Sequence, residues 1–374
     1  MTSNLSRVAC RNCGYEYNAP DQLRCEICNN PFKARPVPIA DARSPITLGV
    51  SLAVALAVAG GGYWLWKQLS PAVDTGILPA GPIAAASLNR TPPNGVQIYP
   101  TMGDVPGVPE GLFTYGGSRP LAPLRSQVAL AQFQKAYPKF RLRYTEPVSG
   151  SGDSNWGTEK VLSGELAFAQ ASMPVTDAQY ARAQNHGFVL QQIPIAYDAR
   201  VYFVHPALGI DSLSVEQARA IFRGTITNWK QVGGPDLAIR PFFPSYSGKS
   251  LKAQGAGTNM QPVRDFTAAI RKVATTPGGI SQSTAALVAG QKSVRLLAIR
   301  TTSGERISPV GPDGKVNAAA VRDGTYPLAL RQFVVIRRDG QLDEQAGLAY
   351  VNLLLCDEGQ KLIQQAGLVP LRVF

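Results

Sequence analysis

Hydrophobic and polar residues alternate with two different periods along the C-terminal two thirds of the chain. Apolar residues recur at helical spacing over 122–137, whereas they alternate with arginines over 140–144, which is strand periodicity. Ser214 followed by Gln217 forms a capping box that predicts a helix from Val215. Further predicted elements are strands near 166–171, 201–203 and 332–337, and a helix over 343–367 that breaks near 357–359. This alternation predicts an α/β fold with mixed connections.

One segment shows neither the helical nor the strand periodicity of apolar and polar residues. Residues 46–66 form a run of 21 residues without a charge, ended by Lys67. At ~1.5 Å per residue a helix of this length spans ~31 Å, close to the thickness of a bilayer core. A cleaved signal peptide has a short basic region directly before its apolar core, but here 45 residues precede the run. We therefore predict an uncleaved transmembrane helix.

The segment before this helix carries a cysteine pattern. Cys10 and Cys13 form one CxxC pair, and Cys25 and Cys28 form a second. Four thiolates at this spacing resemble a zinc ribbon, so residues 1–35 are predicted to hold a structural Zn²⁺. A disulfide pair is the alternative, which a reducing cytoplasm disfavours. Six Lys and Arg within 1–45, against Lys67 alone close to the other end, place the N-terminus in the cytoplasm.

The segment after the helix divides into a tether and a large domain. Residues 67–109 are rich in Pro, Gly and Ala and predict an extended linker. Residues 110–374 are long enough for a two-lobed core and carry 29 Lys and Arg against 19 Asp and Glu. This balance favours anionic partners, although a solvated positive surface is the alternative. Residues 1–35, which we call the head, do not show the basic and aromatic face that would indicate nucleic-acid binding.

Three glycine-rich segments carry candidate chemistry, at 116–118, 149–152 and 255–258. Each can direct backbone N–H groups and a short hydroxyl at an anion, as glycine turns before helices do. Taken singly, each would be read as an ordinary turn.

In order along the chain, these segments and several others resemble one family. The marks are YGGS at 115–118, GSG at 150–152, IPIA at 193–196, IFRGTITNWKQVGG at 221–234, GAGT at 255–258, and EGQKLI at 358–363 followed by VPL at 369–371. They resemble the phosphate-binding subunit family of ABC transporters, which has the type 2 periplasmic-binding-protein fold. The resemblance covers nearly all of 112–374. It implies two lobes, phosphate or another small oxyanion between them, and an ABC permease as a possible partner.

The resemblance also implies a set of ligand-binding residues, and this chain departs from the family at several of them. Ser172 stands where the family has an acidic residue or a serine, and Lys252 stands where it has an arginine. Serine both donates and accepts, and lysine keeps the charge but loses the bidentate fork. Arg119 aligns with an aromatic residue and either enters the site or points to water. The predicted ligand-binding residues are Ser118, Arg119, Ser149, Ser151, Ser172, Lys252, Gly257 and Thr258.

Catalytic patterns are not apparent in the sequence, which predicts a protein that is not an enzyme. The two histidines, His186 and His205, lie in unrelated contexts without a nucleophile motif. Asp343 reads as a helix cap rather than a base, and Cys356 lies on an apolar face, as a buried and inert thiol does.

Two function classes remain open, with a third suggested by charge alone. The first is a solute-binding protein held in the bacterial inner membrane, with its main domain in the periplasm, serving uptake or sensing. The second is a signalling or protein-interaction module on the same scaffold that has lost phosphate binding, because a cytoplasmic head suggests a cytoplasmic partner. The third is a binder of an anionic polymer, whose binding would depend strongly on salt.

Overall fold

A computed structural model describes residues 98–148, 152–244 and 256–373. The four cysteines of the predicted zinc site, the apolar run 46–66 and residues 67–97 of the predicted linker lie outside these residues. The prediction of an extended linker is wrong for 98–109, because Met102 and Val105 are buried in the hydrophobic core of the domain. Within the described ranges, no helix combines the length and the apolar character needed to cross a bilayer.

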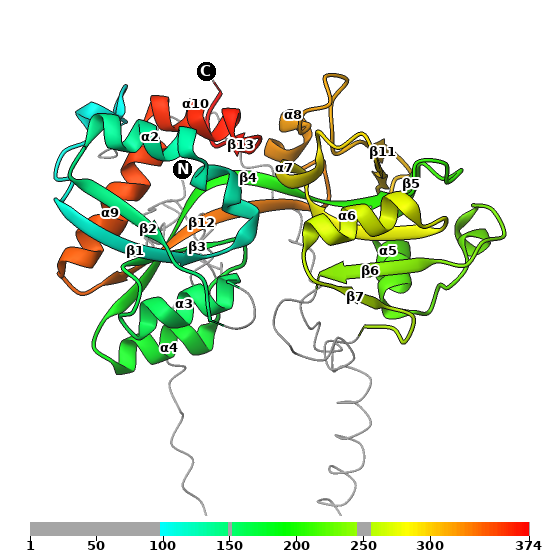
Figure 1. The fold of residues 1–374 in the computed structure, drawn as a ribbon, viewed down its shortest axis with the longest axis horizontal. Coiled ribbons are helices and arrows are strands. Elements are labelled where there is room, and N and C mark those ends of the chain that lie inside the picture. Colours follow the sequence, from blue (N-terminus) through cyan, green and yellow to red (C-terminus); the bar gives the residue numbers. More distant parts are fainter. Residues whose placement is uncertain (1–97, 149–151, 245–255, 374) are drawn as a thin grey trace, which may run out of the picture. The chain divides into compact units, whose positions relative to one another are not determined.

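The first lobe is built on a mixed sheet (Figure 1). Its strands, in spatial order, are β2 (Phe140–Tyr144), β1 (Gly111–Gly117), β3 (Phe168–Ala171), β12 (Ala329–Arg338) and the first part of β4 (Val189–Val204). Strand β1 runs parallel to β2 and β3, whereas β12 runs antiparallel to β3 and β4. A short strand, β13 (Val369–Pro370), also pairs with β4.

Helices cover both faces of this sheet, as the α/β pattern predicts. One hydrophobic cluster joins the sheet to α2 (Gln127–Ala136), α9 (Leu342–Leu355) and α10 (Asp357–Gln365). A second cluster on the other face joins it to α3 (Ser154–Leu162) and α4 (Asp177–Asn185). Because β3 and β12 contribute side chains to both clusters, they are buried on both faces, which accounts for their nearly continuous apolar sequences.

The second lobe continues from the same strand. β4 pairs with β12 over 189–199 and then with β8 (Gly279–Thr284) over 200–204, so a single 16-residue strand belongs to both lobes. The sheet then continues through β6 (Arg240–Pro244) and β7 (Gln261–Val263), with β9 (Arg295–Leu296) beside β4. The predicted two-lobed α/β architecture is confirmed for the described residues.

Smaller elements complete the second lobe and the connections. Helices α5 (Val215–Arg223) and α6 (Phe266–Thr275) flank this lobe, and β5 (Ser212–Ser214), β10 (Ala298–Arg300) and β11 (Arg306–Ile307) form a three-stranded sheet. The remaining elements are η1 (Met102–Asp104), η2 (Arg119–Arg125), η3 (Trp229–Val232), α7 (Ala285–Val288) and α8 (Ala318–Arg322).

Local signals place most helix ends correctly, including the break between the last two helices, with two exceptions. The capping box at Ser214 starts α5 as predicted. The helix expected from residue 122 starts only at Gln127, because Ser126 caps it and Pro123 lies within a preceding 3₁₀ turn. Asp343 is not a cap; it lies in the first turn of α9, whose N-cap is Gln341. The break between the last two helices comes at Cys356, whose buried Sγ accepts the Gly359 N–H and caps α10.

Candidate functional site

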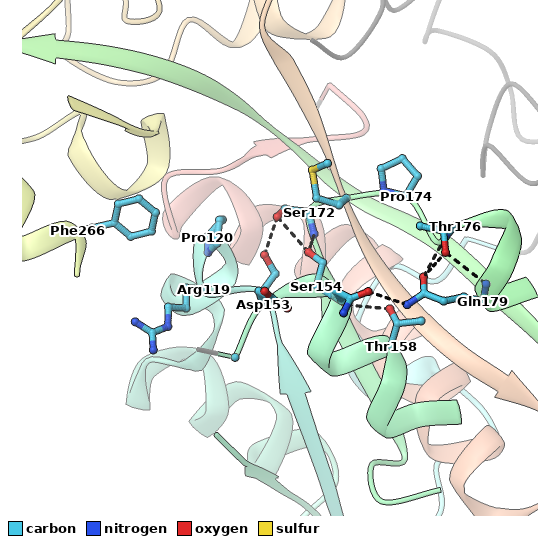
Figure 2. A pocket seen from close by; sticks show the side chains of 14 residues that line it. Arg119, Pro120, Asp153, Ser154, Thr158, Ser172, Pro174, Thr176, Gln179 and Phe266 are labelled. Atoms are coloured by element: carbon cyan, nitrogen blue, oxygen red, sulfur yellow. Dashed lines mark hydrogen bonds between the residues drawn. The ribbon is translucent and has the colours of Figure 1, made fainter. Parts of the chain in front are cut away.

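A pocket of about 390 Å³ lies where β1, β3 and α3 meet in the first lobe (Figure 2). Ser118 follows the end of β1, Ser172 follows the end of β3, and Ser154 is the first residue of α3. All three line the pocket. Ligands bind in this position in many open α/β sheets, beyond the carboxyl ends of parallel strands.

The register between β1 and β3 brings the first two serines together. Gly117 lies opposite Gln170, and the Ser118 N–H donates to the Gln170 carbonyl over 2.7 Å. Two residues beyond Gln170, the Ser172 hydroxyl accepts a hydrogen bond from Ser118 Oγ over 2.8 Å. The parallel strands β1 and β3 end side by side. They therefore bring Ser118 and Ser172 into contact, although these residues are 54 positions apart in the sequence.

Gly117 makes this close approach possible. Its φ of +107° lies in a region that side chains disfavour, and a Cβ there would lie 2.2 Å from the Gln170 carbonyl oxygen. Helix α3 also comes close, because a Cβ on Gly157 would lie 2.9 Å from the Gly117 Cα. The two glycines therefore allow β1, β3 and α3 to meet.

The start of α3 supplies the third hydroxyl and a set of backbone donors. Ser154 Oγ accepts the Ser172 N–H over 3.0 Å and lies 3.4 Å from Ser172 Oγ. Asp153 caps the helix, with Oδ1 accepting the Trp156 N–H over 2.7 Å. A helix N-terminus carries partial positive charge and favours an anion. The hydroxyls of Ser118, Ser154 and Ser172, together with the start of α3, form a surface suited to a small oxyanion. We call this surface the hydroxyl floor.

Arg125 and Tyr144 fix the position of the loop that carries Ser118 and Arg119. Arg125 donates from Nη2 to the carbonyl oxygens of both residues, over 3.4 and 3.3 Å, and its guanidinium lies 3.8 Å from the ring centroid of Tyr144. The Tyr144 hydroxyl donates to the Gly117 carbonyl over 2.9 Å. Burial raises the pKa of Tyr144, so this hydroxyl stays protonated and remains a donor at neutral pH.

Charged side chains of both signs line the pocket. Arg119 is the one basic residue among the described lining residues, and Asp153 is the one acidic residue. The charge of Arg119 also acts on Asp265, the N-cap of α6. The hydrogen bond from the Ala268 N–H does most to lower the pKa of Asp265. Arg264 and Arg119 lower this pKa further, whereas partial burial raises it. Arg119 thus adds a positive charge to the pocket lining, and its guanidinium points away from Ser154 and Ser172 (Figure 2).

The rest of the wall includes carbon surface. Pro120, Pro174 and Phe266 contribute carbon surface to the pocket (Figure 2), and Met173 lines it as well. Phe266 is the first residue of α6, from the second lobe, whereas Met173 and Pro174 directly follow Ser172. Thr176 and Gln179, which form the capping box of α4, complete the polar side.

The structure places the predicted site residues in three groups. Ser118, Arg119 and Ser172 line the pocket together. Gly257 and Thr258 do not line it; a Cβ on Gly257 would lie 2.5 Å from the Gly224 Cα, and its N–H donates to the Phe222 carbonyl. Ser149, Ser151 and Lys252 lie outside the described residues. In the described structure, therefore, Gly257 has a packing role within the second lobe.

Sequence reasoning missed Ser154 and Asp153. The four residues 153–156 read as a small insertion in the family pattern, yet Asp153 is an N-cap residue that marks the start of α3. That capping signal could have located the helix, and with it the Ser154 hydroxyl. Neither histidine of the chain lines the pocket.

Comparisons with known proteins identify the family. A family model described as the PBP superfamily domain matches residues 97–358. The chain belongs to the PBP superfamily. Among curated PBP relatives, Protein SphX of Synechococcus elongatus is 26% identical over 277 residues, covering 70% of this chain and 77% of that protein. The phosphate-binding protein PstS of Staphylococcus aureus is 22% identical over 231 residues, covering 59% of this chain and 68% of that protein.

Solved structures of this superfamily share the fold. A substrate-binding protein from Clostridium perfringens, crystallised with bound phosphate, has a TM-score of 0.55 at 18% identity, covering 70% of this chain and all of that one. An ABC-type phosphate transport receptor from Vibrio cholerae has a TM-score of 0.54 at 18% identity, covering 69% and 99%. At this identity the likeness concerns the fold, and the ligand has to be argued from the pocket.

Proposed function

We propose that this protein binds phosphate or a related small oxyanion, as the extracytoplasmic solute-binding component of an ABC-type uptake or sensing system. The observation that carries the proposal is the convergence of Ser118, Ser154 and Ser172 at the N-terminus of α3, beside Arg119. Relatives whose names record phosphate binding support the choice of anion. The proposed role is binding and delivery of the anion rather than catalysis.

The same hydroxyls determine how selective the pocket is. Ser172 can donate to a fully ionised oxyanion or accept from a protonated one, because a hydroxyl has both capacities. A carboxylate in its place would accept only and would select for a protonated ligand. We therefore expect sulfate to compete with phosphate.

Titration calorimetry of the full chain in detergent micelles tests this proposal. Ser172→Ala removes the central hydroxyl and is expected to weaken phosphate binding on the order of tenfold or more, because hydrogen bonds to charged groups contribute about 1.5–3 kcal/mol. Ser303→Ala, at an exposed position in a turn, is the matched control and should bind as the wild type does. Absence of binding by the wild type to millimolar phosphate and sulfate would contradict the proposal. That result would favour the interaction-module alternative.

We further propose that 46–66 anchors the protein in the bacterial inner membrane, and that 67–97 spaces the binding domain from it. The basic residues before the anchor place the head in the cytoplasm. The head would then be available to a cytoplasmic partner, and the outer domain to an ABC permease.

The head is proposed to fold around one structural Zn²⁺ held by Cys10, Cys13, Cys25 and Cys28. Purified full chain is expected to contain about one zinc per molecule, because four thiolates complete a tetrahedral structural site. Elemental analysis by plasma mass spectrometry should show that Cys10→Ser loses most of this zinc. Cys356→Ser, which replaces a buried thiol of the first lobe, should keep it. Equal zinc in both variants would contradict the assignment.

A further inference from the structure

We infer that the pocket takes an oxyanion that carries a small neutral organic group, such as a phosphate monoester, in addition to the bare ion. This inference rests on the proposed function, because the oxyanion head would occupy the hydroxyl floor argued above. It extends that function by naming the chemical class of the ligand. Four observations on the described lining residues carry it.

The hydroxyl floor is concentrated on one side of the pocket. Ser172 Oγ lies 2.8 Å from Ser118 Oγ and 3.4 Å from Ser154 Oγ, so the three hydroxyls address one small group. Ser118 is 1% exposed and Ser154 is 8% exposed, so the cluster is largely enclosed by the protein. This floor can satisfy the oxygens on one face of a tetrahedral head.

Four of the described lining residues present mainly carbon to the pocket. Pro120 and Pro174 have no backbone N–H, and the side chains of Met173 and Phe266 are apolar. Each oxygen of bare phosphate requires a partner, and a polar oxygen held against such a wall without one is destabilised. An alkyl substituent facing the same wall instead gains from burial.

The size of the pocket agrees with a larger ligand. Its volume of about 390 Å³ lies within the range of roughly 300–1,000 Å³ that small-molecule sites occupy. A tetrahedral oxyanion has only five heavy atoms, so space remains for a short substituent between the floor and Phe266.

The charge distribution restricts the substituent. Arg119 and Asp153 are the charged residues of the described lining, and their formal charges cancel. The described lining therefore offers no further side-chain cation to balance a second negative group on the ligand. A neutral substituent is therefore favoured over an acidic one.

Titration calorimetry of the full chain with inorganic phosphate, methyl phosphate, ethyl phosphate and propyl phosphate tests the inference. Affinity is expected to rise about fourfold for each added CH₂ group that becomes buried. Phe266→Ala should flatten this rise, so the ratio of its affinity for propyl phosphate to its affinity for inorganic phosphate should fall to less than half of the wild-type ratio. Met173→Ser, on a loop rather than at a helix start, serves as a second variant with the same expected pattern. Ser303→Ala should keep the full rise.

The outcomes separate the two proposals. Phosphate binding with esters at least tenfold weaker would overturn this inference and leave the proposed function standing. A rise along the ester series that both wall variants retain in full would also overturn it, because the named wall would not be the cause. Binding of esters without binding of inorganic phosphate would support the inference and restrict the function to organic ligands. No binding of any of the four would overturn both proposals.

Discussion

Gly117→Ala is expected to abolish phosphate binding and to destabilise the first lobe by about 3 kcal/mol or more. The added Cβ would lie 2.2 Å from the Gln170 carbonyl oxygen, in a backbone conformation with φ of +107°. Strands β1 and β3 would have to separate, and this movement would pull Ser118 away from Ser172. Calorimetry for binding, and chemical denaturation followed by tryptophan fluorescence for stability, would measure both effects.

Gly187 provides a control that separates the cost of a left-handed backbone conformation from the cost of the steric clash at Gly117. Gly187 has a similar left-handed conformation, with φ of +82°, but a Cβ there would meet nothing within 4 Å. Gly187→Ala should therefore cost only about 1 kcal/mol and should leave phosphate binding intact. If the two variants lose equal stability, the close approach of β1 to β3 is not what requires glycine at 117.

Asp198→Asn is expected to remove a pH dependence of stability that the wild type shows between about pH 4 and pH 7. Asp198 is fully buried on β4, close to the point where the strand passes from one lobe to the other. Its Oδ1 accepts the N–H groups of Ala199 and Ala286, over 2.7 and 3.2 Å. Burial raises the pKa of Asp198 from 3.8 to about 7, against the lowering effect of these hydrogen bonds.

The sign of the effect follows from proton binding. Between the unfolded pKa and the folded pKa the native state holds more protons than the unfolded state, so stability falls as the pH rises. The loss is complete above pH 7 and amounts to at most about 4 kcal/mol for a shift of this size. Asparagine retains the accepting oxygen and carries no charge.

Denaturation curves at pH 5, 6, 7 and 8 would test this prediction. The wild type should lose stability along the series, whereas Asp198→Asn should lose much less and be the more stable of the two at pH 8. Asp236→Asn, at an exposed ion pair with Lys230, is the control and should keep the wild-type slope. Parallel slopes for the wild type and Asp198→Asn would contradict the assignment.

The pocket was only partly predictable from the chain. Ser118, Arg119 and Ser172 could be proposed from motif order, and the structure brings them together. Ser154 could not be proposed in this way. A serine that follows a helix cap gives no sign of a binding role until the helix is placed against Ser172. Gly257 was expected in the site, but it instead packs on Gly224, a contact between distant glycines that no local pattern reveals.

Local features of the sequence were enough to predict the α/β alternation, the capping box of α5 and the two-lobed class. Periodicity and caps depend on residues within a turn or two of one another, so they can be read from a single chain. Only the tertiary structure decided that three serines from separate segments meet in one pocket and that Asp198, on β4, is fully buried. Both depend on strand register and on what covers each side chain, and these are properties of the packed molecule rather than of any short segment.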